Sequence, residues 1–163
     1  MKFISSTNDI RRYLGLKPKK NIKFKNISID TRTIKKDSLF IALKGQNFNG
    51  NRFIQKALSS GATAVLCSDK SYINKNNVIY VPSVRKALAR ISSQIAFNFK
   101  GKKILITGSN GKTSTTNIIS KSLPKCSSTI KNFNNEIGLP ISVMYAKKDS
   151  KYMVLEAGAA KKG

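Results

Sequence analysis

The sequence predicts an α/β protein in two parts: a small mixed α/β domain, followed by the start of a parallel-sheet domain with a phosphate-binding loop. Short apolar runs alternate with amphipathic helical patterns along the chain. A glycine-containing loop at residues 107–113 separates one such run from a helical pattern. The short basic segment 99–103 (FKGKK) is typical of a junction, so we expect domains at residues 1–99 and 100–163.

In the first part, Thr7 is positioned to cap a short helix that ends at Gly15, and Ser83 to cap a longer helix. Strands are expected at residues 22–29 (with an irregularity near 25–26), 38–43, 64–67 and 78–81. Two helices are expected from apolar spacing, one carrying Phe53, Ile54, Ala57 and Leu58, the other carrying Val84, Leu88, Ile91 and Ile95.

The second part begins with residues 104–106, which read as a buried strand. The spacing of Thr116, Ile118, Ile119, Ser122 and Leu123 predicts one helix face, ended by Pro124. Further strands are expected at 127–130 and 152–155, and Pro140 is expected to open a short helix through Tyr145. Two helices cannot cover both faces of three apolar strands, so we expect exposed apolar surface in this part.

The loop reads T-G-x-x-G-K-T, a shorter variant of the common phosphate-loop pattern. Gly108 and Gly111 permit a tight turn, and the N–H groups at the following helix start can point at phosphate. Lys112 can neutralise phosphate charge, and the Thr113 hydroxyl can ligate Mg²⁺. ATP binding is predicted for Thr107, Gly108, Ser109, Asn110, Gly111, Lys112, Thr113 and Ser114. The alternative is a glycine turn with a solvated lysine, which the flanking strand and helix disfavour.

Glu156 follows the apolar run 152–155, at the carboxyl end of an expected strand. Ligands of open α/β sheets bind outside the carboxyl ends of strands, where Thr107 is also expected. The position of Glu156 therefore predicts a ligand-binding carboxylate beside the phosphate-binding loop. The alternative is a solvated glutamate at a strand end.

Composition restricts the class of protein further. The chain has 31 Lys+Arg, 7 Asp+Glu and no histidine, which excludes histidine-based catalysis and ordinary zinc sites on this stretch. Its net charge of +24 is spread along the whole sequence, so we expect salt-sensitive adhesion but no specific nucleic-acid partner. Cys67 and Cys126 lie outside any paired motif and are expected to pack as small apolar residues. No apolar run approaches the length of a membrane span, and we expect a cytoplasmic protein.

Four motifs in order resemble the ATP-dependent Mur ligases, and within them the D-alanyl-D-alanine-adding branch. They are Asp30-Thr31-Arg32 with the segment 38–45, the loop 107–113, the segment 132–140 (NFNNEIGLP) and Glu156-Ala-Gly-Ala. The sequence departs from the family pattern at Asn51, where the family often has histidine.

The resemblance implies an enzyme of peptidoglycan synthesis that joins D-alanyl-D-alanine to UDP-N-acetylmuramoyl-tripeptide through an acyl phosphate, with ATP and Mg²⁺. By that resemblance Lys112 and Glu156 are expected to be catalytic, and Thr113 and Glu156 are expected to hold Mg²⁺. Substrate-binding residues are expected to be Asp30, Thr31, Arg32, Gly45, Asn134 and Asn135. It also implies a monomer at full length. The family's central domain continues past the glutamate and a third domain follows, so the 163-residue polypeptide is expected to be an inactive N-terminal fragment.

Several alternatives remain open at this point. The chain could belong to another Mur-type amino-acid ligase, or bind nucleotide and UDP-sugar without catalysis. Asp30 and Arg32 could contact the uridine diphosphate or only pair with each other. Asn134 and Asn135 could bind substrate or only shape the turn before Ile-Gly-x-Pro.

Overall fold

A computed structural model describes residues 2–46, 48–130 and 133–158. Two compact units are present: Ser5–Arg90, and a second formed by Met1–Ile4 with Ile91–Gly163. Both are α/β with parallel sheets, which confirms the predicted fold class. The division between the units falls inside one long helix, and Phe3 contacts Phe99 of the second unit with tilted rings at a centroid distance of 6.4 Å. The boundary of functional domains at 99/100 stays a prediction.

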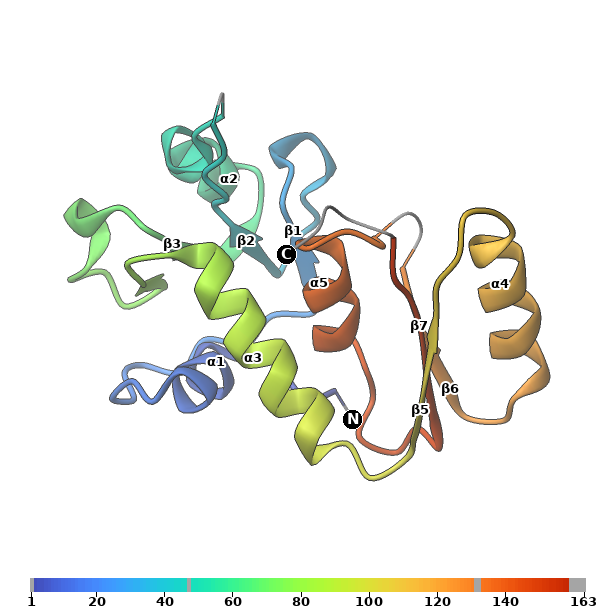
Figure 1. The fold of residues 1–163 in the computed structure, drawn as a ribbon. Helices are drawn as coiled ribbons and strands as arrows, with labels where there is room; N and C mark the ends of the chain where they lie inside the picture. Colours follow the sequence, from blue (N-terminus) through green and yellow to red (C-terminus); the bar gives the residue numbers. More distant parts are fainter. Residues whose placement is uncertain (1, 47, 131–132, 159–163) are drawn as a thin grey trace. The chain divides into compact units, whose positions relative to one another are not determined.

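The unit Ser5–Arg90 is built on a four-stranded parallel sheet whose strands lie in chain order, β1-β2-β3-β4 (Figure 1). The strands are β1 (Asn26–Ser28), β2 (Ser38–Ile41), β3 (Ala62–Cys67) and β4 (Val78–Tyr80). The helices are α1 (Thr7–Leu14), α2 (Ile54–Ser59) and the start of α3 (Val84–Asn98), with short 3-10 turns at Thr31–Thr33, Gly50–Phe53 and Lys70–Tyr72.

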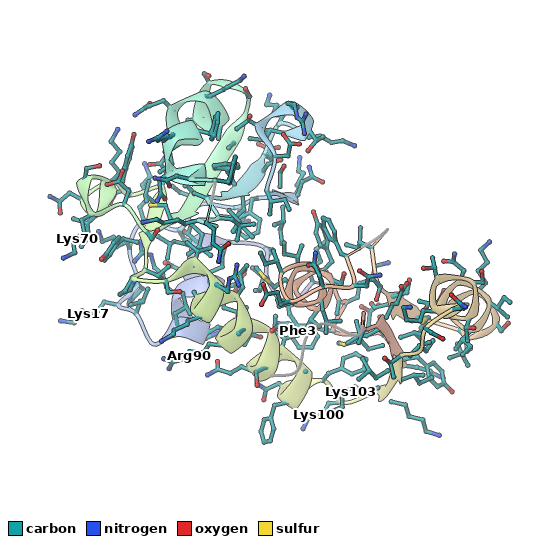
Figure 2. The ribbon with its side chains drawn as sticks, turned by 45° about the horizontal axis from the view of Figure 1, so that its top comes forward. Phe3, Lys17, Lys70, Arg90, Lys100 and Lys103 are labelled. Carbon is teal, nitrogen blue, oxygen red and sulfur yellow. The ribbon has the colours of Figure 1, made fainter. Side chains whose placement is uncertain are left out.

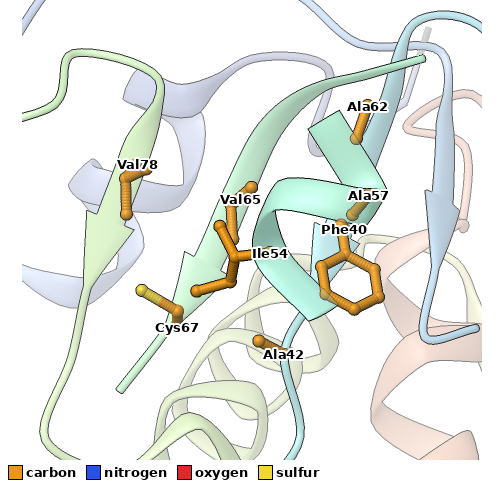
Figure 3. Packing of buried hydrophobic residues seen from close by; sticks show 8 residues of the cluster. All are labelled: Phe40, Ala42, Ile54, Ala57, Ala62, Val65, Cys67 and Val78. Carbon is orange, nitrogen blue, oxygen red and sulfur yellow. The ribbon is translucent and has the colours of Figure 1, made fainter. Parts of the chain in front are cut away.

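One cluster of the core of this unit lies between α2 and the sheet. All four residues of β2 are buried, as are five of the six in β3. Ile54 and Ala57 of α2 pack onto Phe40, Val65 and their neighbours (Figure 3). Cys67 belongs to this cluster, and burial raises the pKa of its thiol, consistent with the packing role expected for it.

Two local predictions in this unit need correction. The cap of α1 is Ser6, whose hydroxyl accepts from Asp9 N, while the buried Thr7 hydroxyl accepts from Ile22 N at 3.0 Å. Phe53 does not join the buried face of α2, because it ends the preceding 3-10 turn, and its side chain is 37% exposed.

The second unit carries a three-stranded parallel sheet in the order β5-β7-β6. Its strands are β5 (Lys102–Ile106), β6 (Cys126–Ser128) and β7 (Tyr152–Glu156), and its helices are α4 (Lys112–Ser122), α5 (Gly138–Met144) and the end of α3. The last strand in the chain is thus the central one. The carboxyl ends of the strands meet at the edge where α4 begins (Figure 1).

In this unit the burial of Leu105 and Ile118 and the start of α5 differ from expectation. β5 lies at the sheet edge, and Leu105 is 63% exposed. The strand is present as predicted, but the prediction that it is buried is wrong. Thr116 is buried in α4, whereas Ile118 is 66% exposed and lies off the packed face. Pro140 is the third residue of α5, which begins at Gly138. The exposed Leu105 and Ile118 agree with the incomplete apolar cover expected of this part.

Candidate functional site

The loop at residues 107–113, which we call the phosphate-type loop, connects β5 to α4 at the carboxyl edge of the three-stranded sheet. Gly108 and Gly111 take positive φ angles of 146° and 74°, which side chains rarely adopt. Gly111 is also the N-cap of α4 and offers no side chain to the first helical N–H groups. The loop thus presents a helix start with backbone donors, the arrangement that binds anions.

Lys112 curls back over this loop. Its ammonium group donates to the carbonyl oxygens of Gly108 at 2.6 Å and Ser109 at 3.1 Å. Loop and lysine form one wall of a cleft of about 290 Å³, lined by Ser109, Asn110, Gly111, Lys112, Thr113, Ser114, Asn134 and Glu156. The cleft therefore combines backbone donors, one cation and one carboxylate.

Glu156 is the most constrained residue of this cleft, with only 2% of its surface exposed. Its two carboxylate oxygens accept from Thr113 Oγ1 at 2.9 and 3.1 Å, and Oε1 also accepts from Asn134 Nδ2 at 2.8 Å. Its backbone N–H donates to Thr129 Oγ1 at 2.7 Å. We call Thr113, Asn134 and Glu156 the carboxylate network. The structure thus brings together the two residues predicted to hold Mg²⁺.

These donors suit a magnesium ion by their chemistry. Mg²⁺ in nucleotide sites takes one or two protein oxygens and completes its shell with phosphates and water. A threonine hydroxyl beside a buried carboxylate meets that requirement, with Thr113 Oγ1 in contact with both Glu156 oxygens. Over the described ranges, no three His, Cys, Asp or Glu side chains gather as an all-protein metal cage would need.

The two predicted asparagines lie in different places. Asn134 lines the cleft, and its backbone carbonyl accepts a hydrogen bond from Gly158 N at 2.7 Å. Asn135 turns its Oδ1 toward the backbone, accepting from Ile137 N at 3.1 Å and Gly138 N at 2.8 Å. Asn135 therefore shapes the start of α5, and its role in substrate binding stays a prediction.

A second cleft, of about 410 Å³, lies in the unit Ser5–Arg90 and includes the predicted turn. Its lining residues are Ile29, Asp30, Thr31, Arg32, Phe40, Phe48, Phe53 and Lys56. Phe48 and Phe53 stack with ring centroids 5.6 Å apart and planes 11° apart. Gly45 lies outside the lining but donates its N–H to Phe48 O at 2.8 Å, which closes the loop that carries the ring.

Asp30 and Arg32 pair with each other in this cleft. Arg32 donates from Nη2 and Nε to the Asp30 carboxylate at 2.6 and 3.0 Å, and its backbone N–H donates to Oδ1 at 2.9 Å. The hydrogen bonds from Arg32 lower the pKa of Asp30 to about 2. Because a guanidinium has five N–H donors, the ion pair still leaves donors on Nη1. Pairing and ligand binding are thus compatible.

Three residues in or next to these clefts, Thr129, Phe53 and Lys56, were not predicted as site residues from the sequence. Thr129, directly after β6, accepts the backbone N–H of Glu156, but hydroxyl residues near a strand end are too common to give a signal. Phe53 and Lys56 line the second cleft. Phe48 did carry a sequence signal, since a phenylalanine in a glycine- and asparagine-rich loop has no core to enter and could stack on a base.

A helix start behind a glycine loop, at the carboxyl edge of a parallel sheet and facing a buried carboxylate, defines a P-loop nucleotide-binding α/β protein. The family comparisons identify it more closely. A family described as "Mur ligase family, catalytic domain" matches residues 23–95, and "Mur ligase middle domain" matches residues 106–163. The chain belongs to the Mur ligase family.

Individual relatives agree with this assignment. The UDP-N-acetylmuramoyl-tripeptide–D-alanyl-D-alanine ligase of Buchnera aphidicola (subsp. Baizongia pistaciae) is 38% identical over 164 residues, covering 98% of this chain and 35% of the relative. The UDP-N-acetylmuramoyl-L-alanyl-D-glutamate–2,6-diaminopimelate ligase of Rickettsia prowazekii is 40% identical over 103 residues, covering 63% of this chain and 21% of the relative.

Among solved structures, the MurF ligase from Thermotoga maritima in complex with ADP matches with a TM-score of 0.69 and 32% identity. That match covers 85% of this chain and 33% of the other. The chain spans about a third of the length of the D-alanyl-D-alanine ligases it matches. Among the residues that the structure describes, no helix combines the length and apolar character that a membrane crossing requires.

Proposed function

We propose that this chain provides the UDP-substrate unit and the phosphate-binding part of the ATP unit of a UDP-N-acetylmuramoyl-tripeptide–D-alanyl-D-alanine ligase. The observation that carries the proposal is the carboxylate network. It ties the phosphate-type loop, through Glu156, to Asn134 in the segment 132–140 that resembles the D-alanyl-D-alanine branch. Relatives that bear this enzyme name, and a solved MurF–ADP complex, support it.

In this reaction the γ-phosphoryl group of ATP passes to the terminal carboxylate of the tripeptide, and the amine of D-alanyl-D-alanine then displaces phosphate. Phosphoryl transfer depends mainly on positioning and charge neutralisation. The helix start at Gly111 would orient the phosphates, and Lys112 would move from its loop carbonyls to a phosphate oxygen. Thr113 and Glu156 would hold Mg²⁺, which neutralises phosphate charge when bound.

The second cleft is proposed to hold the uridine diphosphate of the substrate. Phe48 and Phe53 offer a stacked aromatic surface to a base, and Arg32 and Lys56 offer positive charge to the diphosphate. Asp30 would hold the Arg32 guanidinium in place through their paired hydrogen bonds. Both nucleotides are soluble metabolites, so we propose a cytoplasmic enzyme. The resemblance to the Mur ligases is the ground for proposing a monomer at full length.

The diaminopimelate-adding branch is the second candidate, favoured by the Rickettsia relative. The segment 132–140 distinguishes the two. In this chain the segment carries Asn134, whose side chain donates to Glu156. The diaminopimelate-adding branch is expected to have a threonine-rich segment at the same position. The D-alanyl-D-alanine assignment accounts for that segment, so it is the one proposed.

Nuclear magnetic resonance titration of the 163-residue chain tests both clefts at once. Mg²⁺-ATP should shift the amides of residues 108–114 together with Glu156, while UDP should shift those of residues 30–32 and 45–50. UDP shifts confined to residues 108–113 would contradict the substrate assignment. ATP shifts that are the same with and without Mg²⁺ at Thr113 and Glu156 would contradict the metal assignment.

A further inference from the structure

The lysines of the second unit gather at one edge of its sheet. The unit has ten lysines among its described residues, and nine of them lie away from the phosphate-type loop, where only Lys112 stands. The nine are Lys2, Lys100, Lys102, Lys103, Lys121, Lys125, Lys147, Lys148 and Lys151. A distribution that looks even along the sequence becomes one-sided in the fold, because lysines recur wherever the chain returns to the amino ends of the strands.

Backbone contacts place these residues side by side. Lys102 N donates to Lys151 O and Lys151 N donates to Lys125 O, both at 2.9 Å, so three lysines form a row across the amino ends of β5, β7 and β6. A Cβ on Gly101 would overlap the Lys151 carbonyl, so the backbone next to Lys100 and Lys102 packs closely against Lys151. Lys147 and Lys2 form an isolated antiparallel β-bridge through their backbones. Burial, together with the charge of Lys147, lowers the pKa of Lys2.

The edge carries little opposing charge. Asp149 is the one carboxylate that the described segments bring to these strand starts, whereas Glu136 and Glu156 lie toward the carboxyl edge. All six arginines of the chain fall in the other unit, Ser5–Arg90. The positive charge at this edge is therefore made of lysine ammonium groups, which act as solvated point charges without the planar fork of arginine.

An exposed aromatic side chain stands at the same edge. Phe97, near the end of α3, is 86% exposed. The ammonium of Lys103 donates to the carbonyl of Ala96 at 3.1 Å, so the residue next to Phe97 touches the lysine cluster. Figure 2 labels Lys100 and Lys103 just beyond that helix end. Half-buried Tyr145 and Tyr152 belong to the same edge, and Tyr152 pairs in register with Lys102.

We propose that this lysine edge, with Phe97 as an apolar anchor, docks the second unit onto an anionic phospholipid surface. Clustered lysines are attracted by the negative surface potential of such a membrane, and a phenyl ring can enter the boundary between headgroups and acyl chains. Tyrosines at headgroup level fit the same arrangement. The phosphate-type loop lies at the opposite edge of the sheet, so docking leaves the nucleotide cleft open.

Nucleic acid is the competing polyanion, and the edge suits it less well. Sequence-tolerant nucleic-acid surfaces combine a basic groove with aromatic rings on which successive bases stack. At this edge Phe97 projects from a helix end, and Tyr145 is already covered by the Lys2 ammonium at 5.0 Å from its ring centroid. A protruding phenyl ring beside a row of point charges matches a lipid surface more closely.

Vesicle sedimentation with the 163-residue chain tests the proposal. The chain should bind phosphatidylcholine vesicles containing about 30% phosphatidylglycerol and not bind pure phosphatidylcholine, because each lysine near the surface contributes a factor of about five. Changing Lys102, Lys148 and Lys151 to Gln should weaken binding on the order of 100-fold. The matched control changes Lys17, Lys36 and Lys70, in the other unit, to Gln with the same loss of net charge.

Phe97→Ser separates anchoring from simple charge attraction, and should weaken vesicle binding about ten-fold while leaving ATP binding unchanged. Equal loss in both triple variants would overturn the proposal, since binding would then follow net charge alone. Unchanged vesicle binding in Phe97→Ser would overturn the anchor. Poly(U) that removes the chain from the vesicles at equimolar phosphate would identify nucleic acid as the better ligand and also overturn it.

Discussion

The two clefts are built in opposite ways. The cleft of the second unit is organised by a buried carboxylate that joins α4, the segment before α5 and the end of β7. The cleft of the unit Ser5–Arg90 is lined instead by partly exposed side chains, an aromatic pair and an ion pair whose arginine is 84% exposed. Substitutions in the first should change folding and binding together, whereas substitutions in the second should change binding with little effect on folding.

The largest effect is expected at Glu156. Glu156→Ala leaves Thr113 Oγ1 and Asn134 Nδ2 without their acceptor and should lower the free energy of unfolding by about 1–3 kcal/mol. It should also abolish any gain in ATP affinity from Mg²⁺. Calorimetry with and without Mg²⁺, beside thermal unfolding, measures both, with Glu136→Ala as the control. If Glu156→Ala keeps both its stability and the effect of Mg²⁺ on ATP affinity, the carboxylate network contributes neither to folding nor to metal binding.

Lys112→Ala should separate binding from folding within the same cleft. Its ammonium contacts only loop carbonyls in the structure, so we expect little change in the unfolding temperature. ATP binding should weaken by about 1.5–3 kcal/mol, the range of a charge-assisted contact. Isothermal titration with Lys70→Ala as the control measures this change. An unchanged ATP affinity would remove Lys112 from the nucleotide site.

The aromatic pair of the other cleft should show the contrasting behaviour. Phe53→Ala removes a ring that is 37% exposed and stacked on Phe48, so the unfolding temperature should stay nearly constant. UDP affinity should fall by about 0.5–1.5 kcal/mol through lost stacking. Fluorescence or calorimetric titration with UDP tests this, using Phe97→Ala as an aromatic control. A large loss of stability in Phe53→Ala would contradict the comparison between the clefts.

The smallest effect is expected for the contribution of the Asp30–Arg32 ion pair to stability at low pH. The hydrogen bonds from Arg32 lower the pKa of Asp30 to about 2 from an ordinary value of 3.8. A lowered folded-state pKa stabilises the fold above pH 3.8, and that contribution is lost as the pH falls from 3.8 toward 2. Exposure of the pair keeps it small. The carboxyl carbon shift of Asp30 should titrate near pH 2, and near its ordinary value in Arg32→Ala; equal midpoints would rule out the ion pair.

Local patterns predicted much of this molecule because they depend on neighbours in the chain. The glycine loop, the stripe Val84, Leu88, Ile91 and Ile95, and Glu156 at a strand end all follow from spacing. Leu105 and Ile118 were misjudged, because their burial depends on which strands lie beside them. Thr129 could not be found, because its contact with Glu156 spans 27 residues of sequence.

The order of strands in the two sheets has a consequence for synthesis on the ribosome. In the unit Ser5–Arg90 each new strand pairs with the one made just before it, so its sheet can grow as the chain emerges. In the second unit β5 and β6 both pair with β7 and are made first. They therefore wait without partners until residue 152 has left the exit tunnel, and during that interval the apolar strand β5 is open to chaperones and to misassembly.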